Sequence, residues 1–368
     1  MRIVLVDPAS YTLPYDHHLA SALARRGHEV ELLAAPFPFG SAPEPDGYRR
    51  SELFFARSGP LLRRSPRSPL RYAAKGIEYL PSARRLLRRV DELDPDVVHV
   101  QWLPYPTLDR RWLRALARRR PAVFTAHDVL PRRSENRVGV WRDVFATADR
   151  TIVHSEAARE RLVSLGVAPE RLVVVPHALF PAQAAVEAPS GRTLLFFGLI
   201  RRSKGLDLLL RALPHIPDAR LVVAGDPLEP AGPYRELAER LGVAERIEWR
   251  LHFLGDEEVA AVMATATVVV LPYRRIESSG VLATALGHGR PAVVADVGSL
   301  GDTIREFEAG LAVPPEDPEA LAAACTRLLD DAAALRAAFE GTRRAAGALS
   351  WDAAADAHER LYEEVARR

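Results

Sequence analysis

The chain has 368 residues, of which 48% are hydrophobic and 27% charged, and 50 Lys plus Arg against 48 Asp plus Glu leave a net charge of +2. These values are typical of a globular protein with room for two domains, each large enough to bury its own core. An internal disulfide is excluded, because Cys325 is the single cysteine, and no apolar run approaches the length that crosses a bilayer.

The charge is unevenly distributed along the chain. Residues 1–180 hold 29 Lys plus Arg and 20 Asp plus Glu, about +9, which leaves 21 and 28, about −7, for the remainder. The arginines of the basic half are not interleaved with aromatic residues, so we do not expect nucleic-acid binding. One cysteine and a start that resembles a strand instead of a secretory signal predict a cytoplasmic protein.

The first half alternates strand-like and helix-like segments. It opens with a buried strand at 2–7, a helix at 16–26 closed by Gly27, and a strand at 29–33. After a loop rich in Pro and Gly, we expect a strand at 51–56, a basic stretch at 60–94, strands at 96–100, 122–126, 151–154 and 171–175, and helices at 108–119, 139–148 and 155–165.

A second series follows residues 176–192, which lack periodicity and predict a linker. Strands are expected at 193–197, 220–224, 246–249, 267–271, 291–295 and 311–313, and helices at 318–329, 332–346 and from Ser350, an N-cap candidate, to the end. This alternation predicts an α/β protein of two Rossmann-like, doubly wound domains. Ligands of such sheets bind beyond the carboxyl ends of the strands, so we expect a central cleft.

The strand at 193–197 runs into a cationic loop and then a Leu-rich helix. The loop holds Gly198, Arg201 and Lys204, and Lys204 is one of only two lysines in the chain. Two cations beside the first N–H groups of a helix favour a phosphate site, and a solvated basic loop is the alternative.

Polar residues follow three other predicted strands. His127 and Asp128 end the segment TAHD, where a histidine could bind a substrate hydroxyl or cap the next segment. Glu277, which suits sugar hydroxyls, precedes Ser278, Ser279 and Gly280, whose hydroxyls and N–H groups at a helix start suit an anion. A plain helix cap is the alternative. The loop after the first strand clusters Tyr15, Asp16, His17 and His18, and Asp16 could equally be a helix N-cap.

Other chemistries lack their motifs. The chain has no GxGxxG after either first strand, no GxxxxGK[ST] and no GxSxG, and no spacing of His, Cys or carboxylates resembles a metal site. We therefore expect no metal and no nicotinamide or flavin cofactor.

Taken together, the motifs resemble the retaining glycosyltransferases of the GT-B fold known as glycosyltransferase family four, or the group 1 family. The resemblance rests on FFGLIRRSKGLDLLLRAL, LHFLGDEEVAAVMATATVVVLPYR, ESSGVLATALGHGRPAVVADVGSL and the tail segments GLAVPPEDPEALAAA and SWDAAADAHERLY. In the first half only RRGHEVELL, DVVHVQW and TAHD are convincing. The resemblance implies an acceptor-binding domain at 1–180, a donor-binding domain at 181–350, and a helix at 351–368 that returns to the first domain.

The resemblance also implies a reaction: a hexosyltransferase moves a sugar from a nucleotide-diphosphate-sugar to an acceptor hydroxyl, with retention and without a metal. Arg201, Lys204, Glu277 and His127 would be catalytic. The donor would contact Gly198, Arg201, Lys204, Leu251, His252, Phe253, Leu254, Tyr273, Glu277, Ser278, Ser279, Gly280 and Val281. The acceptor would contact Tyr15, Asp16, His17, Gln101 and Asp128, and could be a glycan, a lipid-linked molecule or a small natural product.

The sequence departs from the family pattern at three places. Ala285 stands where a second glutamate would bind the ribose, Leu199 stands where many relatives have Arg, and residues 11–16 replace a glycine-rich loop. An epimerase or hydrolase acting on nucleotide-sugars, or a non-catalytic partner subunit, is therefore kept as an alternative.

The arginine-rich stretch from 60 to 89 has two interpretations. It could rest on the anionic inner face of a membrane and present a lipid-linked acceptor, or it could be a solvated surface of an arginine-rich chain. The nucleotide, the sugar and the acceptor are not specified by these motifs.

Overall fold

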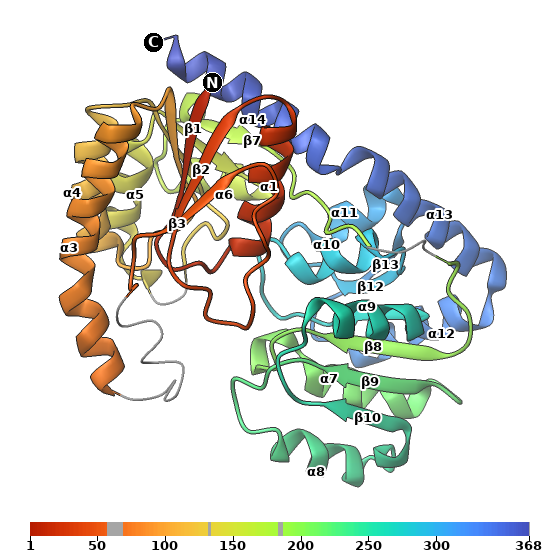
Figure 1. The fold of residues 1–368 in the computed structure, drawn as a ribbon. Helices are drawn as coiled ribbons and strands as arrows, with labels where there is room; N and C mark the ends of the chain where they lie inside the picture. The colour runs from red at the N-terminus through yellow and green to blue at the C-terminus, as the bar shows by residue number, and fades with distance from the viewer. Residues whose placement is uncertain (57–68, 132–133, 183–186, 368) are drawn as a thin grey trace. The chain divides into compact units, whose positions relative to one another are not determined.

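The computed structural model describes residues 1–56, 69–131, 134–182 and 187–367, and only the backbone of residues 69–76 (Figure 1). The described chain forms two compact units. The first comprises residues 1–176 and 351–368, and the second comprises residues 177–350. The first unit therefore reaches Pro176, whereas the predicted first domain extends to residue 180.

The first unit is built on a seven-stranded parallel sheet of order β3-β2-β1-β4-β5-β6-β7. The order reverses between β1 and β4, which marks the topological switch point of a doubly wound sheet. The strands are β1 (Arg2–Asp7), β2 (Glu29–Ala34), β3 (Arg49–Glu52), β4 (Val97–Val100), β5 (Ala122–Thr125), β6 (Arg150–Val153) and β7 (Leu172–Val174).

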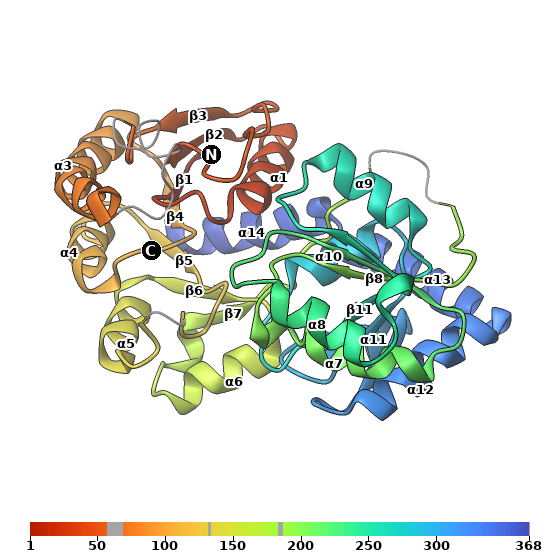
Figure 2. The same ribbon diagram turned by 90° about the horizontal axis from the view of Figure 1, so that it is seen from below.

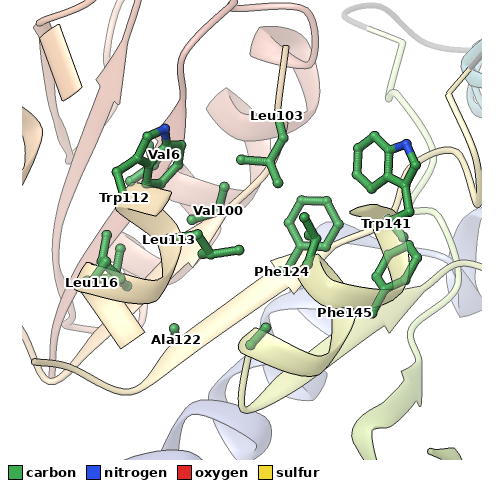
Figure 3. Close-up of a cluster of buried hydrophobic side chains, with 14 of the residues drawn as sticks. Val6, Val100, Leu103, Trp112, Leu113, Leu116, Ala122, Phe124, Trp141 and Phe145 are labelled. Atoms are coloured by element: carbon green, nitrogen blue, oxygen red, sulfur yellow. The ribbon is translucent and has the colours of Figure 1, made fainter. Parts of the chain in front are cut away.

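Helices cover both faces of this sheet (Figure 1), which explains why its central strands are largely apolar. One face carries α1 (Leu13–Arg25) and α14 (Trp351–Ala366), and the other carries α3 (Pro69–Leu93), α4 (Pro106–Ala117) and α5 (Val138–Thr147); α6 (Glu156–Ser164) and the 3-10 turn η2 (Pro169–Arg171) precede β7. Figure 3 shows Leu113 of α4 and Phe145 of α5 packed with Val100 and Phe124 of the sheet. The C-terminal helix α14, predicted to return to the first domain, contacts α1 and β4.

Two predicted elements of this unit are shifted. The helix α1 begins at Leu13 and not at residue 16, with Pro14 in its first turn, so Asp16 lies inside the helix and is not its N-cap. The strand after the Pro-rich loop is β3, at Arg49–Glu52 instead of 51–56; it is a polar edge strand held by backbone pairing with β2, and it has no apolar pattern to predict it.

The second unit is built on a six-stranded parallel sheet of order β10-β9-β8-β11-β12-β13, with its switch point between β8 and β11. The strands are β8 (Thr193–Phe197), β9 (Arg220–Ala224), β10 (Ile247–Arg250), β11 (Val268–Leu271), β12 (Ala292–Ala295) and β13 (Gly310–Val313).

Helices cover both faces of this sheet (Figure 2). A hydrophobic core lies on each face. The core on one face includes residues of α7 (Leu206–Ala212), α8 (Gly232–Arg240) and α12 (Pro318–Asp330). The core on the other face includes residues of α9 (Asp256–Thr265), α10 (Gly280–Gly287) and α11 (Leu300–Phe307). The unit also contains α13 (Ala332–Ala348) and the 3-10 turns η3 (Arg202–Lys204), η4 (Leu213–His215) and η5 (Ala244–Arg246). Among the described residues, none of the helices has the length and apolarity needed to cross a membrane.

The first part of the predicted linker is fixed to the second unit. The backbone N–H of Leu179 donates to the carbonyl of Leu349 at 2.9 Å. A Cβ at Gly287 would lie 2.0 Å from the carbonyl oxygen of Phe180, so only glycine allows α10 to approach this segment so closely.

Candidate functional site

The cationic loop lies at the carboxyl end of β8, beside the switch point of the second sheet. After Gly198, which has a φ of 105°, the chain stays extended and pairs with the loop after β9: Ile200 N donates to Asp226 O at 3.0 Å, and Leu228 N donates to Ile200 O at 3.1 Å. The loop then forms the turn η3, which ends with Lys204. The predicted succession of strand, cationic loop and helix is present.

Lys204 is buried, with 8% of its surface exposed, although it carries an ammonium group. Its Nζ lies 3.6 Å from the centre of the Tyr273 ring, whose face attracts a cation. Burial raises the pKa of Tyr273, and the Ser279 side chain and the charge of Arg201 oppose that rise. Arg201, Lys204, Tyr273 and Ser279 therefore lie together, and we call them the cationic cluster.

Arg274 and Gly205 connect the turn η3, which carries Lys204, to the segment after β11, which carries Tyr273. Arg274 donates from its backbone N to Ser203 O at 3.0 Å and from Nη1 to Arg202 O at 2.7 Å, and its guanidinium binds both carboxylate oxygens of Asp207 at 2.8 Å. Gly205 adopts a φ of 70°, and a Cβ there would lie 1.9 Å from Pro272 O. The turn η3 is thus in direct contact with the segment that follows β11.

The first turn of α10 completes the arrangement. Ser279 is the N-cap, and its Oγ accepts a hydrogen bond from Leu282 N at 3.3 Å. A Cβ at Gly198 would lie 2.8 Å from Cγ2 of Val281, so the start of α10 lies against the end of β8. The positive end of the α10 dipole and two cations meet here, and together they favour an anion.

Glu277 is held just before α10. Its carbonyl oxygen accepts hydrogen bonds from the backbone N and the hydroxyl of Ser299, each at 3.0 Å, and its side chain is half-buried. Ser278 is also half-buried, and Gly280 is exposed. Ala285, the position without the second glutamate, belongs to α10 and is fully buried on its core-facing side.

The four residues predicted to flank the base follow β10 and differ in their surroundings. Leu254 is buried, Leu251 packs against the core, and Phe253 is 47% exposed. His252 Nε2 lies 2.8 Å from Glu258 Oε1, and this hydrogen bond together with that from Gly255 N lowers the pKa of Glu258. Contact of this loop with a base stays a prediction.

In the first unit, His127 lies at the carboxyl end of β5 and is partly exposed. Its Nε2 lies 3.1 Å from Gln101 Oε1, and its Nδ1 lies 3.1 Å from Nε2 of His154, at the end of β6. The Tyr15 ring meets the His127 ring edge to face, with centres 4.8 Å apart. The sequence predicted His127 here, but it gave His154 no role beyond ending a strand.

Three of the predicted acceptor residues are buried, and acceptor contact through them stays a prediction. Tyr15 is 3% exposed, and Asp16 and Gln101 are fully buried. Burial and the charge of Asp7 raise the pKa of Asp16 well above its usual value, and Thr12 Oγ1 lies 3.1 Å from a carboxylate oxygen of each aspartate. These side chains support the strand ends from within the unit.

Two other predicted acceptor residues, His17 and Asp128, are half-buried, so acceptor contact through them stays a prediction. His17 Nδ1 lies 3.1 Å from the Tyr48 hydroxyl. Its neighbour His18 stacks on Trp351, and burial lowers the pKa of His18 to about 4. Within the described parts of the chain, no group of three or more His, Cys, Asp and Glu residues is arranged to hold a metal ion.

Two family descriptions match this chain. "Glycosyltransferase Family 4" matches residues 15–181, and "Glycosyl transferases group 1" matches residues 191–331. The chain belongs to the group 1 glycosyltransferases of family 4. The predicted family and glycosyltransferase activity are thereby confirmed.

Similar proteins support the same assignment. The phosphatidyl-myo-inositol mannosyltransferase of Mycolicibacterium smegmatis is 29% identical over 356 residues, 90% of this chain and 85% of the relative. The MMP alpha-(1->4)-mannosyltransferase of Mycolicibacterium hassiacum is 28% identical over 429 residues, 100% of this chain and 99% of the relative.

Solved structures confirm the predicted GT-B fold class. Sucrose-phosphate synthase from Thermosynechococcus elongatus has a TM-score of 0.75 at 23% identity and covers 99% of both chains. Anabaena Alr3699/HepE in complex with UDP-glucose has a TM-score of 0.71 at 17% identity and covers 99% of this chain and 100% of that one. At these identities the likeness concerns the fold alone.

Proposed function

We propose that this family 4 glycosyltransferase transfers a sugar from a nucleotide-diphosphate-sugar to an acceptor hydroxyl, with retention at the anomeric carbon and without a metal ion. The second unit binds the donor, and the first unit binds the acceptor. The observation that carries this proposal is the cationic cluster beside the start of α10, at the switch point where doubly wound sheets bind their ligands.

The chemistry assigned to the cationic cluster is electrostatic. As the bond between the sugar and the diphosphate breaks, negative charge develops on the leaving phosphate. Arg201, Lys204 and the first N–H groups of α10 stabilise that charge in a partly buried site, where such interactions are stronger than in water. Divalent ions fill this role in many phosphoryl-transfer enzymes, and here two fixed side-chain cations take it.

The remaining donor contacts follow from position. Glu277, fixed through its carbonyl beside α10, binds hydroxyls of the donor sugar, and His127 contacts the sugar near the reacting carbon. The acceptor hydroxyl attacks from the face of the leaving phosphate, which takes its proton. A solved neighbour in complex with UDP-glucose is consistent with a donor of this class.

Donor binding can be tested with a thermal-shift screen of UDP-, GDP-, ADP- and TDP-sugars, because a ligand that binds only the folded state raises its stability. Lys204→Ala should weaken binding of the selected donor, and of pyrophosphate, roughly 10- to 100-fold, since a hydrogen bond to a charged group contributes about 1.5–3 kcal/mol. Arg211→Ala, an exposed cation on α7, is the matched control. Equal binding by Lys204→Ala and the parent would refute the assignment.

The reaction class is tested with the selected donor carrying an isotope label. Transfer with retention gives a product of unchanged anomeric configuration by NMR and continues in excess EDTA. Epimerised or hydrolysed sugar without acceptor would favour the epimerase or hydrolase alternative. Tight donor binding with no sugar transfer to any acceptor tested would favour a non-catalytic partner subunit.

The helix α3 supports a lipid-linked acceptor at a membrane surface. Ile77 and Leu80 are 79% and 58% exposed, Arg84 and Arg88 are also exposed, and their spacing of three and four residues places all four on one helix face. Arginines combined with exposed apolar side chains suit an anionic interface. The relatives named for phosphatidyl-myo-inositol mannosyl transfer agree with such an acceptor. The arginines of 57–68 lie outside the described residues.

Flotation with vesicles of anionic and of neutral lipid tests the membrane contact. We expect binding to anionic vesicles only, and the pair Arg84→Gln with Arg88→Gln should reduce it severalfold. The pair Arg211→Gln with Arg336→Gln removes the same charge from exposed helix positions of the second unit and should leave it unchanged. Lack of flotation at moderate salt would remove the membrane from the proposal.

A further inference from the structure

The carboxyl ends of β4, β5 and β6 are linked by a continuous chain of hydrogen-bonded side chains. It begins at the carbonyl of Val175, which lies 2.9 Å from Nδ1 of His154. His154 Nε2 lies 3.1 Å from His127 Nδ1, and His127 Nε2 lies 3.1 Å from Gln101 Oε1. On the other side of the amide, Gln101 Nε2 lies 3.3 Å from His99 Nδ1, and His99 Nε2 lies 2.7 Å from Thr125 Oγ1.

The first link fixes the direction of this chain, because a carbonyl oxygen can only accept. Nδ1 of His154 therefore carries a proton, and in an uncharged His154 ring Nε2 is an acceptor. His127 must then donate from Nδ1, so its Nε2 is the basic nitrogen of the uncharged pair. In that state Gln101 has to turn its NH₂ group towards His127.

The other orientation of the Gln101 amide gives the pair a charge. When Oε1 faces His127 at 3.1 Å, Nε2 of His127 must also carry a proton. The two imidazoles then hold three protons between them and one positive charge. The orientation of one buried amide and the charge of the histidine pair are therefore linked.

We propose that His154 is a positioning residue for His127. It holds the His127 ring in the form protonated at Nδ1, and the two rings take up one further proton as a unit, at Nε2 of His127. In this step a proton from solvent adds to the Nε2 lone pair and the Gln101 amide turns; no covalent bond to carbon forms or breaks. The inference rests on the proposed function, which places His127 at the donor sugar.

Several of the groups packed around the pair are themselves titratable. Tyr15 of α1 faces both rings, with centres 4.8 Å from His127 and 5.6 Å from His154. Further groups belong to the same region: Asp16 and His18 of α1, His99 of β4, and His358 and Tyr362 of α14. Burial raises the pKa values of Tyr15, Asp16 and Tyr362 and lowers those of His18, His99 and His358, which favours the uncharged form of each.

The test is histidine NMR on the full chain without donor. In ¹⁵N-histidine-labelled protein, assigned with His127→Gln and His154→Gln, both rings should carry their proton at Nδ1 at alkaline pH. On acidification both should change in one shared transition that accounts for one proton. In His154→Leu, His127 should move its proton to Nε2, donate to Gln101 and titrate alone.

The conservative variant separates positioning from proton sharing. In His154→Gln the amide oxygen can still accept from His127, so the Nδ1 form should persist while the shared transition disappears; this variant also carries the test if His154→Leu fails to fold. His215→Gln, an exposed histidine of η4, is the control. A wild-type His127 protonated at Nε2 at alkaline pH, or two independent transitions of one proton each, would overturn the inference.

The outcome is distinguishable from failure of the proposed function, because these spectra need no donor. Pyrophosphate binding depends on the second unit and should be unchanged in both His154 variants. With the donor identified, His154→Leu should alter the pH profile of kcat, whereas a merely structural role would lower activity equally at every pH.

Discussion

Replacing Gly205 with alanine is expected to destabilise the second unit through two separable effects. The first is backbone strain: at a φ of 70° an L-residue costs about 1–2 kcal/mol more than glycine. The second is a collision, because the new Cβ would lie 1.9 Å from Pro272 O, which is backbone and cannot rotate away. Overpacking of this kind costs roughly a further 1–3 kcal/mol.

Gly242→Ala isolates the first effect. Gly242 has a φ of 67°, but a Cβ there would meet nothing within 4 Å. In urea unfolding, the free energy of unfolding of Gly205→Ala should therefore be roughly 1–3 kcal/mol lower than that of Gly242→Ala. Calorimetry should show weaker pyrophosphate binding for Gly205→Ala alone, because η3 carries Lys204. Equal midpoints for the two variants, or unchanged binding in Gly205→Ala, would refute the contact between η3 and Pro272.

Three further outcomes are expected. Ser279→Ala and Ser155→Ala each remove a helix N-cap, and each should lower the free energy of unfolding in urea by about 1 kcal/mol. Only Ser279→Ala should also weaken pyrophosphate binding. An equal loss of pyrophosphate binding in both variants would contradict the phosphate site at the start of α10. Arg274→Lys, which loses the paired bonds to Asp207, should cost roughly 1–3 kcal/mol, and a double-mutant cycle with Asp207→Asn would show no coupling if the pair contributed nothing. Burial raises the pKa of Asp109 to about 6, so the folded state binds this proton more tightly than the unfolded chain does. The free energy of unfolding should therefore fall by roughly 3 kcal/mol as pH rises from about 4 to about 6. Asp109→Asn should flatten this pH dependence, and an unchanged slope would refute the shift.

The strands of the second unit were predictable because their physics is local. The apolar runs that form β8 and β9 have the predicted bounds, since strands buried on both faces read as uninterrupted apolar sequence. The start of α1 was missed although Pro14 signals a first helical turn, because Asp16 offered a plausible cap. The edge strand β3 has a polar sequence and depends on pairing with β2, which no local pattern encodes.

The candidate site was predictable only in part. Lys204 and the start of α10 were found because each follows an apolar strand, but the contact between Lys204 and Tyr273 depends on neighbouring strands that are distant in sequence. The burial of Gln101 depends in the same way on tertiary packing. His154 stands at the end of β6 as His127 stands at the end of β5, and that repetition was the one signal that could have identified it.

The return of α14 to the first unit has a consequence for the order of events during synthesis. The second unit is one continuous segment, residues 177–350, whereas the first is assembled from residues 1–176 and 351–368. Tyr15 packs on Trp351, and His99 bonds Tyr362, so the N-terminal sheet lacks part of one face until α14 has left the ribosome. We therefore expect the usual N-terminal-first order of domain completion to be reversed, so that the first-made half of the chain is the last to finish folding.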